Sequence, residues 1–137
     1  MGGNWVVNNM YNGIAGNLAL TGVLNQTISF DDLQTTNLII NKGGLATYTG
    51  NELTISGDVD FQRGVMVINQ PTRFVVAPNA TVSGGSVDSY LQGYMIHQGS
   101  GNIRFPLGYQ GEYGPLTIQE VFGTTTEYTA SYVNPNT

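Results

Sequence analysis

The sequence predicts an all-β protein, in which a short right-handed parallel β-solenoid (a β-helix) is capped by an antiparallel β-region. Helical periodicity is nearly absent from the 137 residues, and short β-favouring runs are separated by Gly, Asn, Asp and Pro. Apolar segments also recur about every 20 to 22 residues, the length of one coil in many solenoids. We therefore expect an N-terminal segment at 1–13 and solenoid coils at 14–88, followed at 89–137 by an antiparallel cap or the start of a sandwich.

The repeat arranges the apolar residues in three columns with one common period. The first column holds Leu18-Ala19-Leu20, Leu38-Ile39-Ile40, Val59-Asp60-Phe61 and Ala80-Thr81-Val82. The second column holds Leu24, Leu45, Val65 and Val87, and the third holds Leu33, Leu53-Thr54-Ile55 and Phe74-Val75-Val76. Each column predicts one face of a three-sided prism, where every coil adds one strand at about 4.8 Å from the strand below.

Glycine and asparagine mark the expected corners between these columns. We expect turns at 41–44, 49–51 and 56–58, because Gly and Asn tolerate a positive φ. Pro71 and Pro78 flank the Phe74 strand and suit corners, since proline cannot donate to a ladder. A β-sandwich with a strand about every 8 to 12 residues would give a similar pattern, and it is the alternative fold.

After Val87 the runs become longer and more aromatic. We expect antiparallel strands at 89–97, 103–105, 116–121 and 127–133, because an open solenoid end exposes strand edges that need a cap. The stretch IRFPLGYQGEYGPLTI at 103–118 then predicts a shaped connection between two cap strands. Phe105 and Leu107 are its expected core anchors, and Tyr109 to Tyr113 form a tip that could make contacts.

Composition restricts the classes of function. Charged residues make up only 9% of the chain, against roughly 25% in a typical domain, and the polar residues are mostly Asn, Thr, Ser, Gln and Gly. This composition is common in extracellular β-proteins. A net charge of −5 with four Lys and Arg leaves no basic stripe for nucleic acid. There is no cysteine, and no run long enough to predict a membrane span. We expect an extracellular or cell-surface protein whose signal peptide lies outside this sequence.

The second half of the chain resembles a segment of large secreted surface proteins of Bacteroidetes, which are exported by the type IX secretion system. The matching elements are Ser89-Tyr90-Leu91, Gly93, Phe105-Pro106-Leu107-Gly108, Tyr113 and Pro115-Leu116. The resemblance covers roughly 37–137, and it implies an adhesin-like or structural role. It brings no catalytic residues and no cofactor.

The sequence offers few residues for catalysis. His97, the only histidine, could form a triad with Ser100 and Asp88 in principle, but no nucleophile elbow is present. A polysaccharide-cleaving β-helix would need more coils and long loops, so we do not expect an enzyme. Asp58 and Asp60, with the pair at 31–32, are weak calcium candidates, because calcium takes six to eight oxygen ligands. A solvated turn is the simpler interpretation.

These observations favour a non-catalytic structural and adhesive module that acts as a stiff spacer and interaction surface. Its expected partners are surface polysaccharide or other adhesin modules. One alternative is a carbohydrate-binding module, in which Tyr94, Tyr109 and Tyr113 stack on sugars; Tyr48 and Tyr90 are further candidates. Another alternative is a self-assembling fibre subunit, because solenoid ends can stack when the cap is weak.

Overall fold

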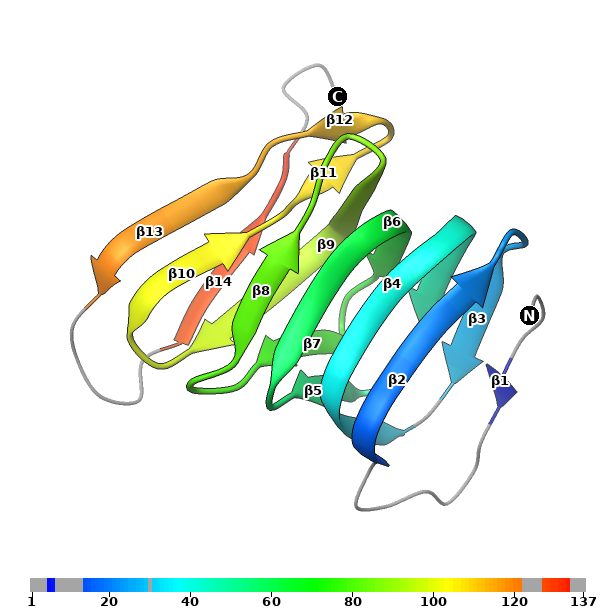
Figure 1. Ribbon diagram of the computed structural model, residues 1–137, viewed down its shortest axis with the longest axis horizontal. Coiled ribbons are helices and arrows are strands. Elements are labelled where there is room, and N and C mark those ends of the chain that lie inside the picture. The colour runs from blue at the N-terminus through cyan, green and yellow to red at the C-terminus, as the bar shows by residue number, and fades with distance from the viewer. Residues whose placement is uncertain (1–4, 7–13, 30, 122–126, 134–137) are drawn as a thin grey trace.

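The computed structural model describes residues 5–6, 14–29, 31–121 and 127–133, and it confirms an all-β fold built on a parallel β-solenoid of about four turns. Figure 1 shows the coils stacked from β2 at one end to β9, with β10 and β13 at the other end. Small antiparallel sheets complete the fold, and the sandwich alternative is wrong. Within the described ranges no helix is long and apolar enough to cross a membrane.

The strands follow one another with short connections. They are β1 (Trp5–Val6), β2 (Ile14–Gly22), β3 (Gln26–Ser29), β4 (Asp32–Tyr48), β5 (Glu52–Ile55), β6 (Asp58–Ile68), β7 (Arg73–Val76), β8 (Thr81–Gly84), β9 (Ser89–Gln98), β10 (Gly101–Phe105), β11 (Gly108–Tyr109), β12 (Glu112–Tyr113), β13 (Leu116–Val121) and β14 (Glu127–Ser131).

The first column forms as the repeat predicts, with one change of register. Leu18 pairs with Leu38, and Leu38 pairs with Val59, so β2, β4 and β6 keep the expected alignment. In the next coil Val59 pairs with Val82 rather than with Ala80, because the turn at 77–80 takes up two more residues than expected. Paired residues of this column therefore lie between 20 and 23 positions apart along the chain.

The third column also forms, and it continues one coil further than expected. Leu33 pairs with Leu53, Leu53 with Phe74, and Phe74 with Met95. All four side chains are buried and point into the core, so this column stacks apolar groups from β4 to β9.

The second column is wrong in its choice of residues. Leu24, Leu45 and Val87 point outward and are 63%, 43% and 55% exposed. The buried members are Ala46, Met66 and Leu91 instead, each one or more positions further along. The expected turn at 41–44 explains the error: β4 passes through it as continuous strand, Lys42 is buried there, and the Lys42 ammonium donates to the Leu24 carbonyl. Since strand residues alternate between faces, a displacement of one residue moves a side chain from core to solvent.

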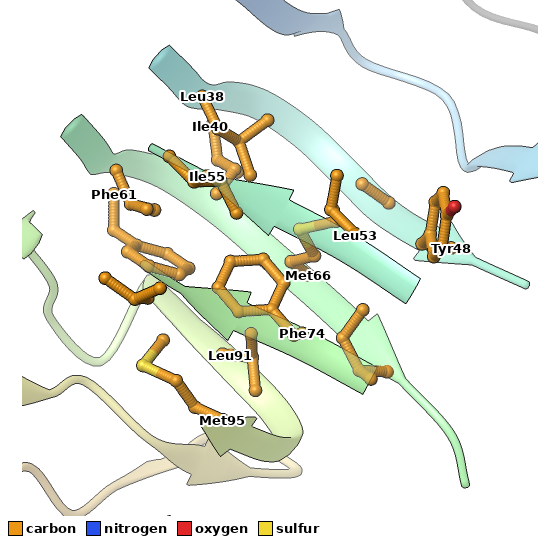
Figure 2. Packing of buried hydrophobic residues seen from close by; sticks show 14 of the residues in the cluster. Leu38, Ile40, Tyr48, Leu53, Ile55, Phe61, Met66, Phe74, Leu91 and Met95 are labelled. Atoms are coloured by element: carbon orange, nitrogen blue, oxygen red, sulfur yellow. The ribbon is translucent and has the colours of Figure 1, made fainter. Parts of the chain in front are cut away.

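One apolar core fills the prism. Figure 2 shows labelled side chains from all three columns, among them Phe61, Met66 and Phe74, pointing into the same interior. Each of these is at most 1% exposed. Because coils in a parallel ladder repeat at about 4.8 Å, each side chain packs on the one below it as well as across the prism.

The parallel ladder extends through residue 97 rather than ending at 88. β9 pairs in parallel with β6 and β7, whereas 89–97 was expected to lie in an antiparallel cap. Its other edge pairs antiparallel with β14. The cap also contains the antiparallel pair of β10 and β13. Along the chain, these two strands are connected through the β11–β12 hairpin. This confirms a shaped connection at 103–118, and Phe105 and Leu107 are buried as expected.

Candidate functional site

The structure brings together two of the three tyrosines predicted to bind a ligand. Tyr94 lies where β9 turns from the second column to the third, and Tyr109 lies in β11. Both face one hollow of about 320 Å³, where they are joined by Tyr132, which follows β14. We call this hollow the tyrosine groove. Its lining residues are Ile68, Asn69, Gln70, Gln92, Gly93, Tyr94, Tyr109, Ser131, Tyr132 and Val133.

Backbone geometry places Tyr94 at the rim of the groove. Gly93 has a φ of +134°, a conformation that side chains rarely adopt, and a Cβ at this position would collide with the Ile68 carbonyl oxygen. Only glycine therefore allows β9 to turn here while staying paired with β6. Tyr94 follows directly and is 37% exposed.

Hydrogen bonds fix two other lining side chains. The Tyr132 hydroxyl donates to Glu112 Oε2 over 2.9 Å, and the Tyr132 ring packs so closely on Gly114 that a Cβ there would overlap it. This hydrogen bond to the Glu112 carboxylate raises the pKa of Tyr132. The backbone N–H of Gln110 donates to Gln92 Oε1 over 3.3 Å, which ties the amide to the β11–β12 hairpin.

Tyr113 does not belong to the tyrosine groove. Its hydroxyl accepts a hydrogen bond from Arg104 Nη2 at 3.2 Å, and its ring lies 6.5 Å from the ring of Tyr90. Tyr90 is buried, and its hydroxyl accepts from the Gly111 N–H at 2.8 Å. These two tyrosines therefore support the hairpin. Tyr48 is also buried, and its hydroxyl donates to the Glu52 carbonyl.

Tyr132 and Gln92 were missed as site residues. Tyr128, Ala130 and Tyr132 alternate along the chain, and all three pack against the core. The antiparallel pairing of β14 with β9 brings Tyr132 to Tyr94 and Tyr109 as well, and the local sequence carries no signal of this pairing.

The calcium candidates are occupied by hydrogen bonds within the protein. Asp58 accepts from the Thr81 hydroxyl. Asp60 accepts from Gln62 Nε2 at 2.7 Å and from Ser83 Oγ at 3.3 Å. In the described part of the chain, no three His, Asp or Glu side chains gather in a way that could hold a metal ion.

His97 is part of the core. It is 5% exposed, and its Nε2 lies 2.8 Å from the carbonyl oxygen of Arg104. The centres of the His97 and Phe105 rings lie 5.0 Å apart, with the rings nearly perpendicular. Burial lowers the pKa of His97, and the bond to Arg104 opposes this only partly. The neutral ring therefore donates a hydrogen bond from Nε2 to the carbonyl oxygen of Arg104. In a catalytic triad, this same nitrogen would have to accept the proton of the serine hydroxyl.

A larger hollow of about 760 Å³ lies at the corner between the first and second columns. Glycine backbone forms much of its wall, beside Lys42, Arg63 and Asp88. Burial lowers the pKa of Lys42, and its ammonium already donates to a backbone carbonyl. This hollow carries no aromatic side chain except the buried Tyr90, so we take the tyrosine groove as the candidate site.

Comparison with protein-family models, with curated proteins and with solved structures finds no match to this chain.

Proposed function

We propose that the chain is a non-catalytic structural and adhesive module of a secreted cell-surface protein, in which a stiff β-solenoid carries an interaction surface. The observation that carries this proposal is the shared core: all three columns are parallel ladders, and they enclose one continuous apolar interior. A closed prism of this kind resists bending, because each coil is bonded to the next along all three faces.

Polar contacts between coils add to this stiffness on the outside of the prism. Asn37 Nδ2 donates to Asn17 Oδ1 at 2.7 Å, and the hydroxyls of Ser29 and Thr49 share a hydrogen bond of 2.7 Å. In each pair the partners lie on neighbouring coils, 20 residues apart. Stacked Asn, Ser and Thr thus provide the outer surface with few charges, which is consistent with the low charge of the sequence.

The location of the proposed module rests on composition and on the resemblance to Bacteroidetes surface proteins. Few charges and many Asn, Thr, Ser and Gly residues are common in extracellular β-proteins. A fold stabilised by backbone ladders needs no disulfide, so the lack of cysteine is compatible with export. In this role the partners would be surface polysaccharide or neighbouring adhesin modules.

Amide hydrogen exchange tests the spacer. If the prism behaves as one stiff body, amides of β4, β6 and β9 that lie in the three columns should exchange slowly and with similar protection. Coils that open one by one within minutes, with little protection in the middle of the stack, would contradict a spacer role. Adhesion is tested separately by coating beads with the chain and measuring retention on polysaccharide surfaces, against beads coated with an unrelated β-protein.

A fibre subunit is a second candidate, because strand edges remain open in the described part of the chain. β2 pairs only with β4, and β8 pairs only with β6, and both strands belong to the first column. Parallel strands of the same column could join head to tail in neighbouring copies. Light scattering over a range of concentrations tests this: growth in mass supports a fibre, and a monomer at all concentrations contradicts it.

A further inference from the structure

We propose that the tyrosine groove binds a neutral glycan, with the rings of Tyr94 and Tyr109 stacking on sugar faces and the amides of Gln70 and Gln92 bonding to hydroxyls. This inference rests on the proposed adhesive function and deepens it, because it names the ligand class and the residues that make the contact.

The first argument is the convergence of the rings. Tyr94, Tyr109 and Tyr132 come from three different segments, β9, β11 and the end of β14, and all three retain solvent exposure. Tyr48 and Tyr90, which lie outside the groove, are buried. The exposure of the groove tyrosines is therefore not shared by every tyrosine of this fold. A tyrosine ring offers an apolar face beside a hydroxyl, which matches the C–H faces and hydroxyl edges of a pyranose.

The second argument is the absence of charge among the described residues that line the groove. Its polar groups are amides and hydroxyls, supplied by Asn69, Gln70, Gln92 and Ser131 together with the tyrosines. Amides can both donate to and accept from a sugar hydroxyl. An acidic glycan or a phosphate would need a cation for charge-assisted hydrogen bonds. Arg73, in the neighbouring hollow, is already paired with Glu52 and Glu127.

The third argument is the fixed position of the lining side chains. The Tyr132 ring is held by Glu112 and by Gly114, and Gln92 is held by the Gln110 backbone. Side chains that are already ordered lose less entropy when a ligand binds. A volume of about 320 Å³ lies at the lower end of the range for small-molecule sites, which suits a short stretch of glycan.

A proline-rich peptide is the competing ligand, because such peptides also dock in grooves lined by aromatic rings. Those grooves recognise apolar proline rings. The amides and hydroxyls around the tyrosine groove favour a ligand that carries many hydroxyls instead.

The experiment compares the unmodified chain with Tyr94→Ala and Tyr109→Ala on an array of neutral, uronic-acid and sulfated glycans, with a proline-rich peptide added to the array. Affinities for the best neutral glycan are then measured by calorimetry. The control is Leu45→Ala, which truncates an exposed apolar side chain that does not line the groove. Thermal unfolding establishes that each variant is folded.

We expect a neutral glycan to bind, and each groove variant to weaken binding by about tenfold or more, which corresponds to the loss of one stacked ring. Leu45→Ala should leave the affinity within about twofold of the unmodified chain, and Tyr109→Phe should retain most of the binding, because it keeps the ring. If an alanine variant does not fold, NMR on the unmodified chain replaces it. Glycan-induced shifts should then concentrate at the amides of residues 92–94 and 109.

Three results would overturn the inference: no neutral glycan binds, only the peptide or acidic glycans bind, or binding is unaffected by both groove substitutions. None of these would affect the hydrogen-exchange result that tests the spacer. Failure of the groove and failure of the structural role are therefore distinguishable.

Discussion

Two leucine-to-alanine substitutions, one at a residue that points into the core and one at a residue that points outward, test which side chains the strands bury. Leu53 is 1% exposed and lies in the third column between its partners Leu33 and Phe74. Leu53→Ala removes buried carbon and leaves a cavity, a change that destabilises proteins by about 2 to 5 kcal/mol. Neighbouring coils are fixed by hydrogen bonds above and below, so the cavity cannot collapse easily. We therefore expect Leu53→Ala to lower the free energy of unfolding by about 3 to 4 kcal/mol, in the upper part of this range.

The matched substitution is Leu45→Ala. Leu45 is 43% exposed and points outward, so its truncation removes little buried area and creates no cavity. We expect a loss of about 1 kcal/mol or less. The two variants should then differ by at least about 2 kcal/mol, or roughly 30-fold in the folding equilibrium.

Urea unfolding followed by circular dichroism measures this difference. With a slope of about 2 kcal/mol per molar urea, Leu53→Ala should lower the midpoint by about 1.5 to 2 M, whereas Leu45→Ala should lower it by about 0.5 M or less. The slopes of all three proteins should agree. Equal midpoints for the two variants, or a larger effect at Leu45, would refute the assignment of faces in the second and third columns.

Three further predictions concern backbone, pH and salt. Gly93→Ala should destabilise the fold by several kcal/mol, because the new Cβ would collide with a backbone carbonyl. Gly101 also has a positive φ, of +98°, but a Cβ there would meet nothing within 4 Å. Gly101→Ala should therefore lower the free energy of unfolding by only about 1 to 2 kcal/mol, through backbone strain. Burial lowers the pKa of His97 below its unfolded value of about 6.5, so the unfolded chain takes up the proton first and stability should fall as the pH drops below about 6.5. His97→Gln should reduce the slope of stability against pH in this window, and an unchanged slope would assign the effect to other groups. Arg73→Ala should cost about 1 kcal/mol or less, since Arg73 and its two glutamate partners are 40 to 45% exposed, and the cost should shrink in high salt. Thermal and urea unfolding measure each of these.

The repeat could be predicted because a coil imposes one period on all its faces. Leu18, Leu38 and Val59 stand in the same relation as Leu33, Leu53 and Phe74, so two columns follow from the apolar spacing alone. The second column could not be predicted in the same way, because β4 continues through 41–44 without a turn. Inward positions continue in phase through this stretch, so Lys42 and Ala46 are buried and Leu45 points outward, and a pattern of apolar residues does not select a lysine over a leucine as an inward residue.

The candidate site was only partly predictable for a different reason. Tyr94, Tyr109 and Tyr113 were all predicted because aromatic rings can stack on sugars, but Tyr113 has a structural role. What separates them is the pairing of segments far apart in the chain. Tyr132 reaches the groove because β14 pairs antiparallel with β9. The residues of these two strands do not show from their own sequence which strand each will pair with.

The position of the groove follows from the way the solenoid ends. Inside the stack, each coil covers the edge of the one before it. The hollow beside Lys42 and Arg63 there has Tyr90 as its aromatic lining residue among the described residues, and that side chain is buried. At β9 the next partner is antiparallel: β14 lies on one half of the strand, and the β11–β12 hairpin lies near the other half. The two partners leave a gap over the turn at Gly93, where side chains from three segments meet. A rigid parallel ladder thus fixes one wall of the site, and the cap supplies the rest. A structural module can in this way hold a binding site at its end without weakening the ladder that makes it stiff.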